Sequence, residues 1–95
     1  MIRMSKSFMA IARFKPGVTP EDISALIPAE QVQAAVLTEQ GLLGGIRVAM
    51  PRRTVFIEAF AESEAAALAN LETLPLSALW EIDLFETTPP AGVPA

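Results

Sequence analysis

The stretch from Leu74 to Leu84, LPLSALWEIDL, decides most of the fold. Pro75 has no backbone N–H and its ring clashes with a preceding helical turn, so the alanine-rich segment before it cannot continue as a helix. From Trp80 onward apolar and acidic residues alternate, and a period of two is typical of a strand. The stretch therefore predicts a helix that ends near Pro75 and a strand that places Glu81 and Asp83 on one face.

The remaining elements are read outward from this ending. Thr19 before Pro20 is typical of a helix start, as is Ser63 before an acidic first turn. These signals predict helices over 20–40 and 64–73, and Pro28 predicts a kink or a break in the first. Apolar stretches between Pro, Gly and Arg turns predict strands over 7–14, 42–50, 54–60 and 79–85.

The resulting order is β-α-β-β-α-β, the ferredoxin-like split βαβ pattern. It predicts an α+β fold with a four-stranded antiparallel sheet and both helices on one face. The 95 residues are expected to form a single domain, 1–95, with a polar leader at 1–6 and a proline-rich tail at 86–95.

The composition excludes several kinds of function. The chain has no cysteine, histidine or tyrosine, which removes disulfides, the usual zinc ligands and the commonest general base. A net charge of −4 argues against nucleic acid, and no apolar run approaches the ~20 residues of a membrane span. With no signal-peptide pattern, we expect a cytoplasmic protein. Gly44-Gly45 opens no phosphate-binding helix, and the sequence shows no constellation of metal ligands, so neither a cofactor nor a metal is expected.

The two faces of the predicted sheet differ. The helix-facing set is expected to form the core, and the opposite face combines large apolar residues with five ionisable ones. Because a monomer would leave these apolar groups in water, and 52% of the chain is hydrophobic, we expect a homodimer or a higher ring. The first set is Phe8, Ala10, Ala12, Phe14, Ile46, Val48, Met50, Val55, Ile57, Ala59, Trp80, Ile82 and Leu84; the second is Met9, Ile11, Ala49, Phe56, Phe60 and Phe85 with Arg13, Arg47, Glu58, Glu81 and Asp83.

The five ionisable residues have two interpretations. They can form ion pairs at the sheet rim, which is common on outer sheet faces. Alternatively, they line a polar cavity between two copies. In that cavity Arg13 and Arg47 are candidates for holding an anionic substrate. Glu58, Glu81 and Asp83 are the candidate catalytic carboxylates, as carriers of a proton.

LPLSALWEIDL resembles the "leucine-proline-leucine, then apolar-acid-Ile-acid-apolar" ending of muconolactone isomerases, and the similarity extends over roughly residues 8–85. Lys15-Pro16 after the first strand, Glu39-Gln40-Gly41 at the helix end and the spacing to Leu74-Pro75 are similar too. The resemblance implies a dimeric α+β barrel, often in decamers, with a pocket between sheet and helices. It also implies cofactor-free proton transfer within a small unsaturated lactone acid. Glu81 and Asp83 match the family. The first strand of the family supplies polar and basic groups, whereas the equivalent stretch here is Met9-Ala10-Ile11, and Arg13 is the one comparable residue on this strand.

Three functions follow as hypotheses. The first is an isomerase-like enzyme that acts by proton transfer on a small, anionic, unsaturated or lactone-type metabolite. The second is a non-catalytic small-molecule-binding or assembly module of the same fold, which the absence of His, Cys and Tyr favours. The third is a cofactor-free monooxygenase. An open pocket in which an unpaired carboxylate faces an arginine would favour an enzyme, and fully paired charges would favour the module.

Overall fold

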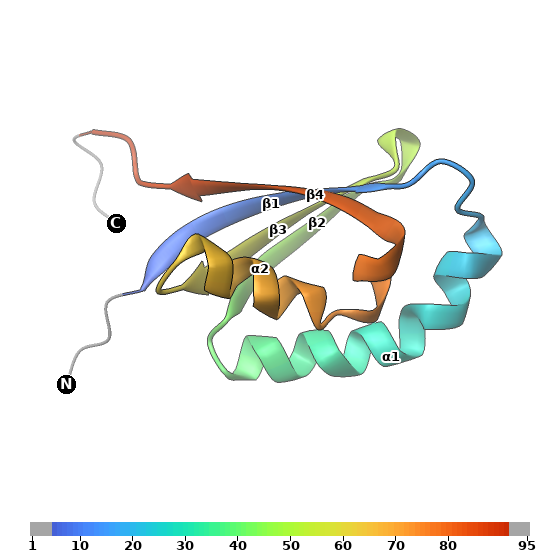
Figure 1. Cartoon of the computed structure of the whole chain (residues 1–95), viewed down its shortest axis with the longest axis horizontal. Helices are drawn as coiled ribbons and strands as arrows, with labels where there is room; N and C mark the ends of the chain where they lie inside the picture. Colours follow the sequence, from blue (N-terminus) through green and yellow to red (C-terminus); the bar gives the residue numbers. More distant parts are fainter. Residues whose placement is uncertain (1–4, 92–95) are drawn as a thin grey trace.

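The computed structural model describes residues 5–91 as an antiparallel sheet with both helices on one side (Figure 1). The strands lie in the order β2-β3-β1-β4, which is compatible with a ferredoxin-like fold. The predicted α+β class, with four antiparallel strands and two helices, is confirmed. The elements are β1 (Lys6–Phe14), α1 (Pro20–Glu39), β2 (Leu43–Ala49), the 3-10 helix η1 (Met50–Arg52), β3 (Thr54–Ala61), α2 (Glu64–Glu72), the 3-10 helix η2 (Pro75–Leu79) and β4 (Trp80–Thr87).

Both helices begin where the sequence predicts. The Thr19 side chain accepts a hydrogen bond from the Asp22 N–H, and the Asp22 carboxylate accepts one from the Thr19 N–H, which completes a capping box. At the start of α2, the Ser63 side chain accepts a hydrogen bond from the Ala66 N–H. Pro28 does not break α1, which continues as one helix and bends along its length (Figure 1). Pro28 is exposed, so water can reach the carbonyl that a proline leaves without a donor.

The last strand differs from its predicted bounds. After α2, residues 75–79 wind into η2 before the chain extends, so β4 begins at Trp80. It continues to Thr87, which pairs with Ser7 of β1. The proline-rich tail therefore begins after Thr87 and not at residue 86, because the ladder with β1 still holds Glu86 and Thr87. Residues 1–4 of the expected leader and 92–95 of the expected tail lie outside the described residues.

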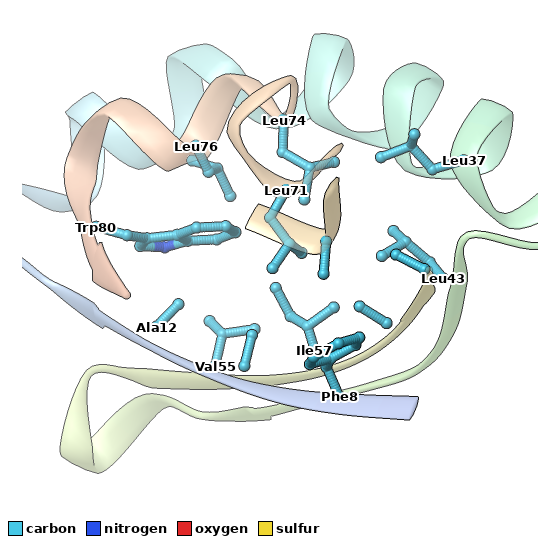
Figure 2. Packing of buried hydrophobic residues seen from close by; sticks show 14 of the residues in the cluster. Phe8, Ala12, Leu37, Leu43, Val55, Ile57, Leu71, Leu74, Leu76 and Trp80 are labelled. Carbon is cyan, nitrogen blue, oxygen red and sulfur yellow. The ribbon is translucent and has the colours of Figure 1, made fainter. Parts of the chain in front are cut away.

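The core lies between the sheet and the two helices (Figure 2). Its fully enclosed large side chains come from three elements and the segment before η2: Phe8 of β1, Ile57 of β3, Leu71 of α2 and Leu74. Trp80 closes one end, with its ring edge-to-face against Phe14 at 6.2 Å between centroids. The predicted helix-facing residues of β1 and β3 are therefore confirmed as core.

The prediction is wrong for the helix-facing residues of β2. Ile46 and Val48 point to the helix side but are 40% and 59% exposed, and Met50 lies in η1 and is also exposed. β2 is an edge strand, and α1 lies over it without covering its helix-side residues Ile46 and Val48. Alternation correctly places Ile46 and Val48 on the helix side, but the degree of their burial depends on how far α1 stands from the sheet. At the start of the strand a register shift between Leu43 and Ile46 interrupts the alternation, and Leu43 is buried in the core.

Candidate functional site

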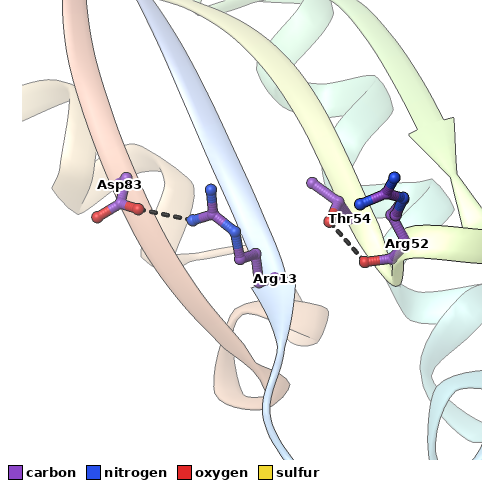
Figure 3. Close-up of polar contacts among 4 residues, drawn as sticks. All are labelled: Arg13, Arg52, Thr54 and Asp83. Carbon is purple, nitrogen blue, oxygen red and sulfur yellow. Dashed lines mark hydrogen bonds and ion pairs between the residues drawn. The ribbon is translucent and has the colours of Figure 1, made fainter.

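Two regions gather chemically active side chains, and the first is the outer face of the sheet. Arg13 on β1 donates a hydrogen bond from Nη1 to the Asp83 carboxylate on β4, at 2.7 Å (Figure 3). Both side chains are more than half exposed, at 54% and 60%. An ion pair this exposed contributes at most about 1 kcal/mol to stability. Arg13 and Asp83 are thus brought together, as the rim interpretation predicted for ionisable residues of this face.

The other three predicted site residues are spread across the same face. Glu58, half-buried on β3, accepts a hydrogen bond from the Gly45 N–H at 3.2 Å. Glu81 lies opposite Arg13 in the strand register, while Arg47 lies opposite Phe56. Arg47 and Glu81 lie on the two edge strands, which are three strand spacings or about 14 Å apart, and the register offsets Glu81 from Arg47 by two further residues along the strand.

Neither of the two hollows described below is lined by any of these five residues. Arg47 and Glu81 are exposed and form no ion pair with any of residues 5–91. A cavity containing them would need a second surface facing the sheet. In a single chain the outer face is therefore a solvated surface that carries the Arg13–Asp83 ion pair and the hydrogen-bonded Glu58. Arg47 and Glu81 add two charges of opposite sign that have no ion-pair partner in residues 5–91.

The second region is a groove on the helix side, between α1 and the open edge of the sheet. It has a volume of about 380 Å³, which lies in the range of small-molecule sites. Leu76 of η2 and Trp80 of β4 close one end. The floor is apolar and comes from the two strands at this edge: Ile46, Val48, Val55 and Ile57.

The α1 wall carries the one ionisable residue among those that line the groove, Glu30. Its Oε1 accepts a hydrogen bond from the Leu76 N–H at 2.9 Å, which ties the middle of α1 to the start of η2. Burial raises the pKa of the Glu30 carboxyl, and the hydrogen bond from Leu76 opposes this rise only in part. Hence Glu30 is a half-buried acid beside apolar side chains, with Ile27 and Ala34 one turn away on the same wall.

Besides Glu30, two lining residues carry a polar side-chain group: Gln31 of α1, with its amide, and Trp80. The Trp80 side chain is 5% exposed, and within residues 5–91 its buried indole N–H has no hydrogen-bond acceptor. Buried donors are usually paired, so an unpaired one requires a local explanation. Here the Trp80 ring fills one end of the core (Figure 2). Its edge-to-face contact with Phe14 adds to this packing, which indicates that the packing is worth more than the missing hydrogen bond.

Sequence reasoning missed the groove but contains one signal for it. Ile23, Ile27, Ala34 and Leu37 mark the inward stripe of α1, and Glu30 occupies the position between Ile27 and Ala34 on this stripe. An acid at a core-facing helical position is uncommon and indicates a specific partner or a site. The sequence contains no comparable signal for the size of the groove, because this size depends on the distance between α1 and β2.

Three further observations concern other kinds of site in the described part of the chain. A second hollow of about 370 Å³ lies at the C-terminal end of α1, with Glu62 as its one ionisable lining residue. Between residues 5 and 91 no cluster of three or more acids is arranged to hold a metal ion. Neither helix in that part of the chain is both long and apolar enough to cross a bilayer.

Comparison of the sequence with protein-family models and with curated proteins finds no match.

Proposed function

We propose that this protein binds a small, largely apolar metabolite in the groove between α1 and the sheet, and that it does so as a homodimer. One observation carries the first part: Ile46 and Val48 point under α1, yet 40% and 59% of their surface is open to water. Apolar side chains left half-solvated in a concave space gain free energy when an apolar ligand covers them, at about 25 cal/mol per Å². A ligand pocket between sheet and helices is also what the resemblance to muconolactone isomerases implies.

The homodimer is supported by the opposite face of the sheet. Phe85 of β4 is 53% exposed there, and Phe56, Ile11 and Met9 are only half-buried. The same face carries Arg47 near one edge and Glu81 near the other, so two copies placed face to face can match charges of opposite sign. Such a cover would hide apolar surface that one chain leaves in water.

Ligand binding is tested with the chain's own fluorophore. Trp80 is the single tryptophan, there is no tyrosine, and its ring lines the groove. Titration with a panel of small apolar alcohols, lactones and acids is expected to give a saturable change in Trp80 fluorescence with at least one of them.

Two valine variants locate the response. Val48→Phe puts a larger side chain into the groove and should weaken binding at least tenfold. Val32→Phe makes the same change on the outer side of α1, where Val32 is 67% exposed, and should leave binding unchanged. Equal responses from the two variants, or no response from the unaltered protein, would contradict the proposal.

Proton-transfer isomerisation of an anionic lactone acid is the second candidate, and the free charges of Arg47 and Glu81 favour it. Neither is paired within residues 5–91, so both are available to a substrate held between two outer faces. Glu81→Gln is expected to abolish isomerisation of an unsaturated lactone acid while preserving the circular dichroism spectrum. Glu86→Gln, on the helix-side register of the same strand, is the control and should keep full turnover.

A further inference from the structure

We infer that the groove selects an uncharged molecule with an apolar body and one hydroxyl group, which donates a hydrogen bond to the Glu30 carboxylate, and that it rejects anions. The inference rests on the proposed ligand site and specifies the chemistry of its occupant. It differs from the anionic substrate expected for the outer face, because the arginines of that face cannot reach the helix side of the sheet.

The position of Glu30 carries the argument. Its Oε1 is occupied by the Leu76 N–H, and the hydrogen bonds found in residues 5–91 give the carboxylate no second donor. No Lys or Arg lines the groove, so its charge has no counter-ion there. A half-buried carboxylate with spare acceptor capacity gains from one more donor.

The apolar floor determines which donor fits best. A carboxylate ligand would place a second negative charge near Glu30 with no cation between them, and like charges at close range disfavour each other. An ammonium group would satisfy Glu30 with one N–H, but apart from the Gln31 amide the rest of the lining offers its other donors only apolar side chains such as Val48 and Val55. A hydroxyl group has one O–H donor, and the Glu30 carboxylate can accept a hydrogen bond from it.

Three probes with one common body test this directly: benzyl alcohol, benzylamine and benzoate. Each is titrated into the full-length protein at about pH 8, where benzoate is an anion and benzylamine mostly a cation. The readout is the indole N–H cross-peak of Trp80 in a proton–nitrogen correlation spectrum, which contains a single such peak because there is one tryptophan. Ligands this small reach a Kd of about 1 mM, which is accessible to this measurement.

Benzyl alcohol is expected to shift the Trp80 peak with a Kd at least ~10-fold lower than that of benzoate or benzylamine. Glu30→Gln keeps an oxygen for the Leu76 N–H and turns an amide donor toward the groove, so the alcohol-to-benzoate preference should fall at least tenfold. Glu39→Gln, an exposed acid at the end of α1, is the matched control and should preserve it.

The outcomes separate this inference from the proposed function. Benzoate or benzylamine binding as tightly as the alcohol overturns the inference and leaves groove binding intact, and so does a Glu30→Gln variant with an unchanged preference. If none of the three probes moves the Trp80 peak, groove binding fails and the inference fails with it. The comparison of the three probes on the unaltered protein decides the matter even if Glu30→Gln does not fold.

Discussion

The surroundings of Glu30 change the protonation of its carboxyl, and this has a consequence for stability. Burial raises the pKa of its carboxyl in the folded chain above the unfolded value of 4.5. A carboxyl with a raised folded pKa contributes stability that is fully present below the unfolded pKa. That contribution is lost as the pH rises through the folded pKa, because the protein must then hold a half-buried charge. Glu30 therefore lowers stability at neutral pH relative to a neutral residue of the same shape.

Glu30→Gln is expected to raise the free energy of unfolding at pH 7, since the amide removes the charge and can still accept from the Leu76 N–H. The gain should shrink as the pH falls toward about 4, where the carboxyl is itself neutral. Urea unfolding of both proteins across this range measures the difference, with Glu39→Gln as the exposed control. A variant less stable than the original at every pH would show that the carboxylate hydrogen bond outweighs desolvation.

The start of β2 shows how one element depends on a side chain of its neighbour. The pairing of β2 with β3 is irregular between Leu43 and Ile46, where Gly44 and Gly45 stand, and glycine in a strand often marks such an irregularity. A Cβ on Gly44 would collide with the Glu58 carboxylate and lie 3.0 Å from the Phe60 ring, whereas a Cβ on Gly45 would meet nothing within 4 Å. Gly44 therefore leaves room for Glu58 to reach the Gly45 N–H.

Gly44→Ala should destabilise the protein by about 1 kcal/mol, because Glu58 must move and give up its hydrogen bond to Gly45. Gly45→Ala is the adjacent control and should change stability little. In a Glu58→Ala background the Gly44→Ala cost should shrink, since only the Phe60 ring then has to shift. Thermal unfolding of the unaltered protein, the two glycine variants, Glu58→Ala and the double variant measures this, and equal costs for the two glycine substitutions would contradict it.

The outer sheet face links the single chain to the proposed dimer. Phe85, at 53% exposed, is more exposed than Phe56 and Phe60, the other aromatic residues of the outer face, so its substitution should cost the isolated chain little. A substitution of Phe85 can therefore test assembly of the dimer while the single chain still folds.

Phe85→Glu is expected to weaken self-association at least tenfold and leave the melting of the separate chain nearly unchanged. Val32→Glu introduces the same charge on the outer side of α1 and should keep the dimer. Sedimentation equilibrium at micromolar concentration measures both. A folded, unaltered protein that sediments as a single 10.2 kDa species would contradict the dimer.

Prediction from sequence succeeded where a local signal decides the structure. The capping box at Thr19, the cap at Ser63 and the alternation in β1 and β3 each depend on a few neighbouring residues, and each is confirmed. The 3-10 turn of η2 was missed, because Pro75 indicates where a helix must end but not what the next residues form. Arg13 and Asp83 were assigned to one face correctly, but their contact depends on the register between β1 and β4.

The order of residues alone determines the six main elements, the faces of the strands and the placement of the ionisable residues on the outer side, because periodicity and capping act over one or two turns of chain. The groove depends on how far α1 stands from β2, which is set by the packing of Leu37, Leu71 and Leu74 between distant segments. Glu30 stands on the inward stripe of its helix in the sequence. It becomes a half-buried acid in an open groove only once η2 folds back to give it the Leu76 N–H.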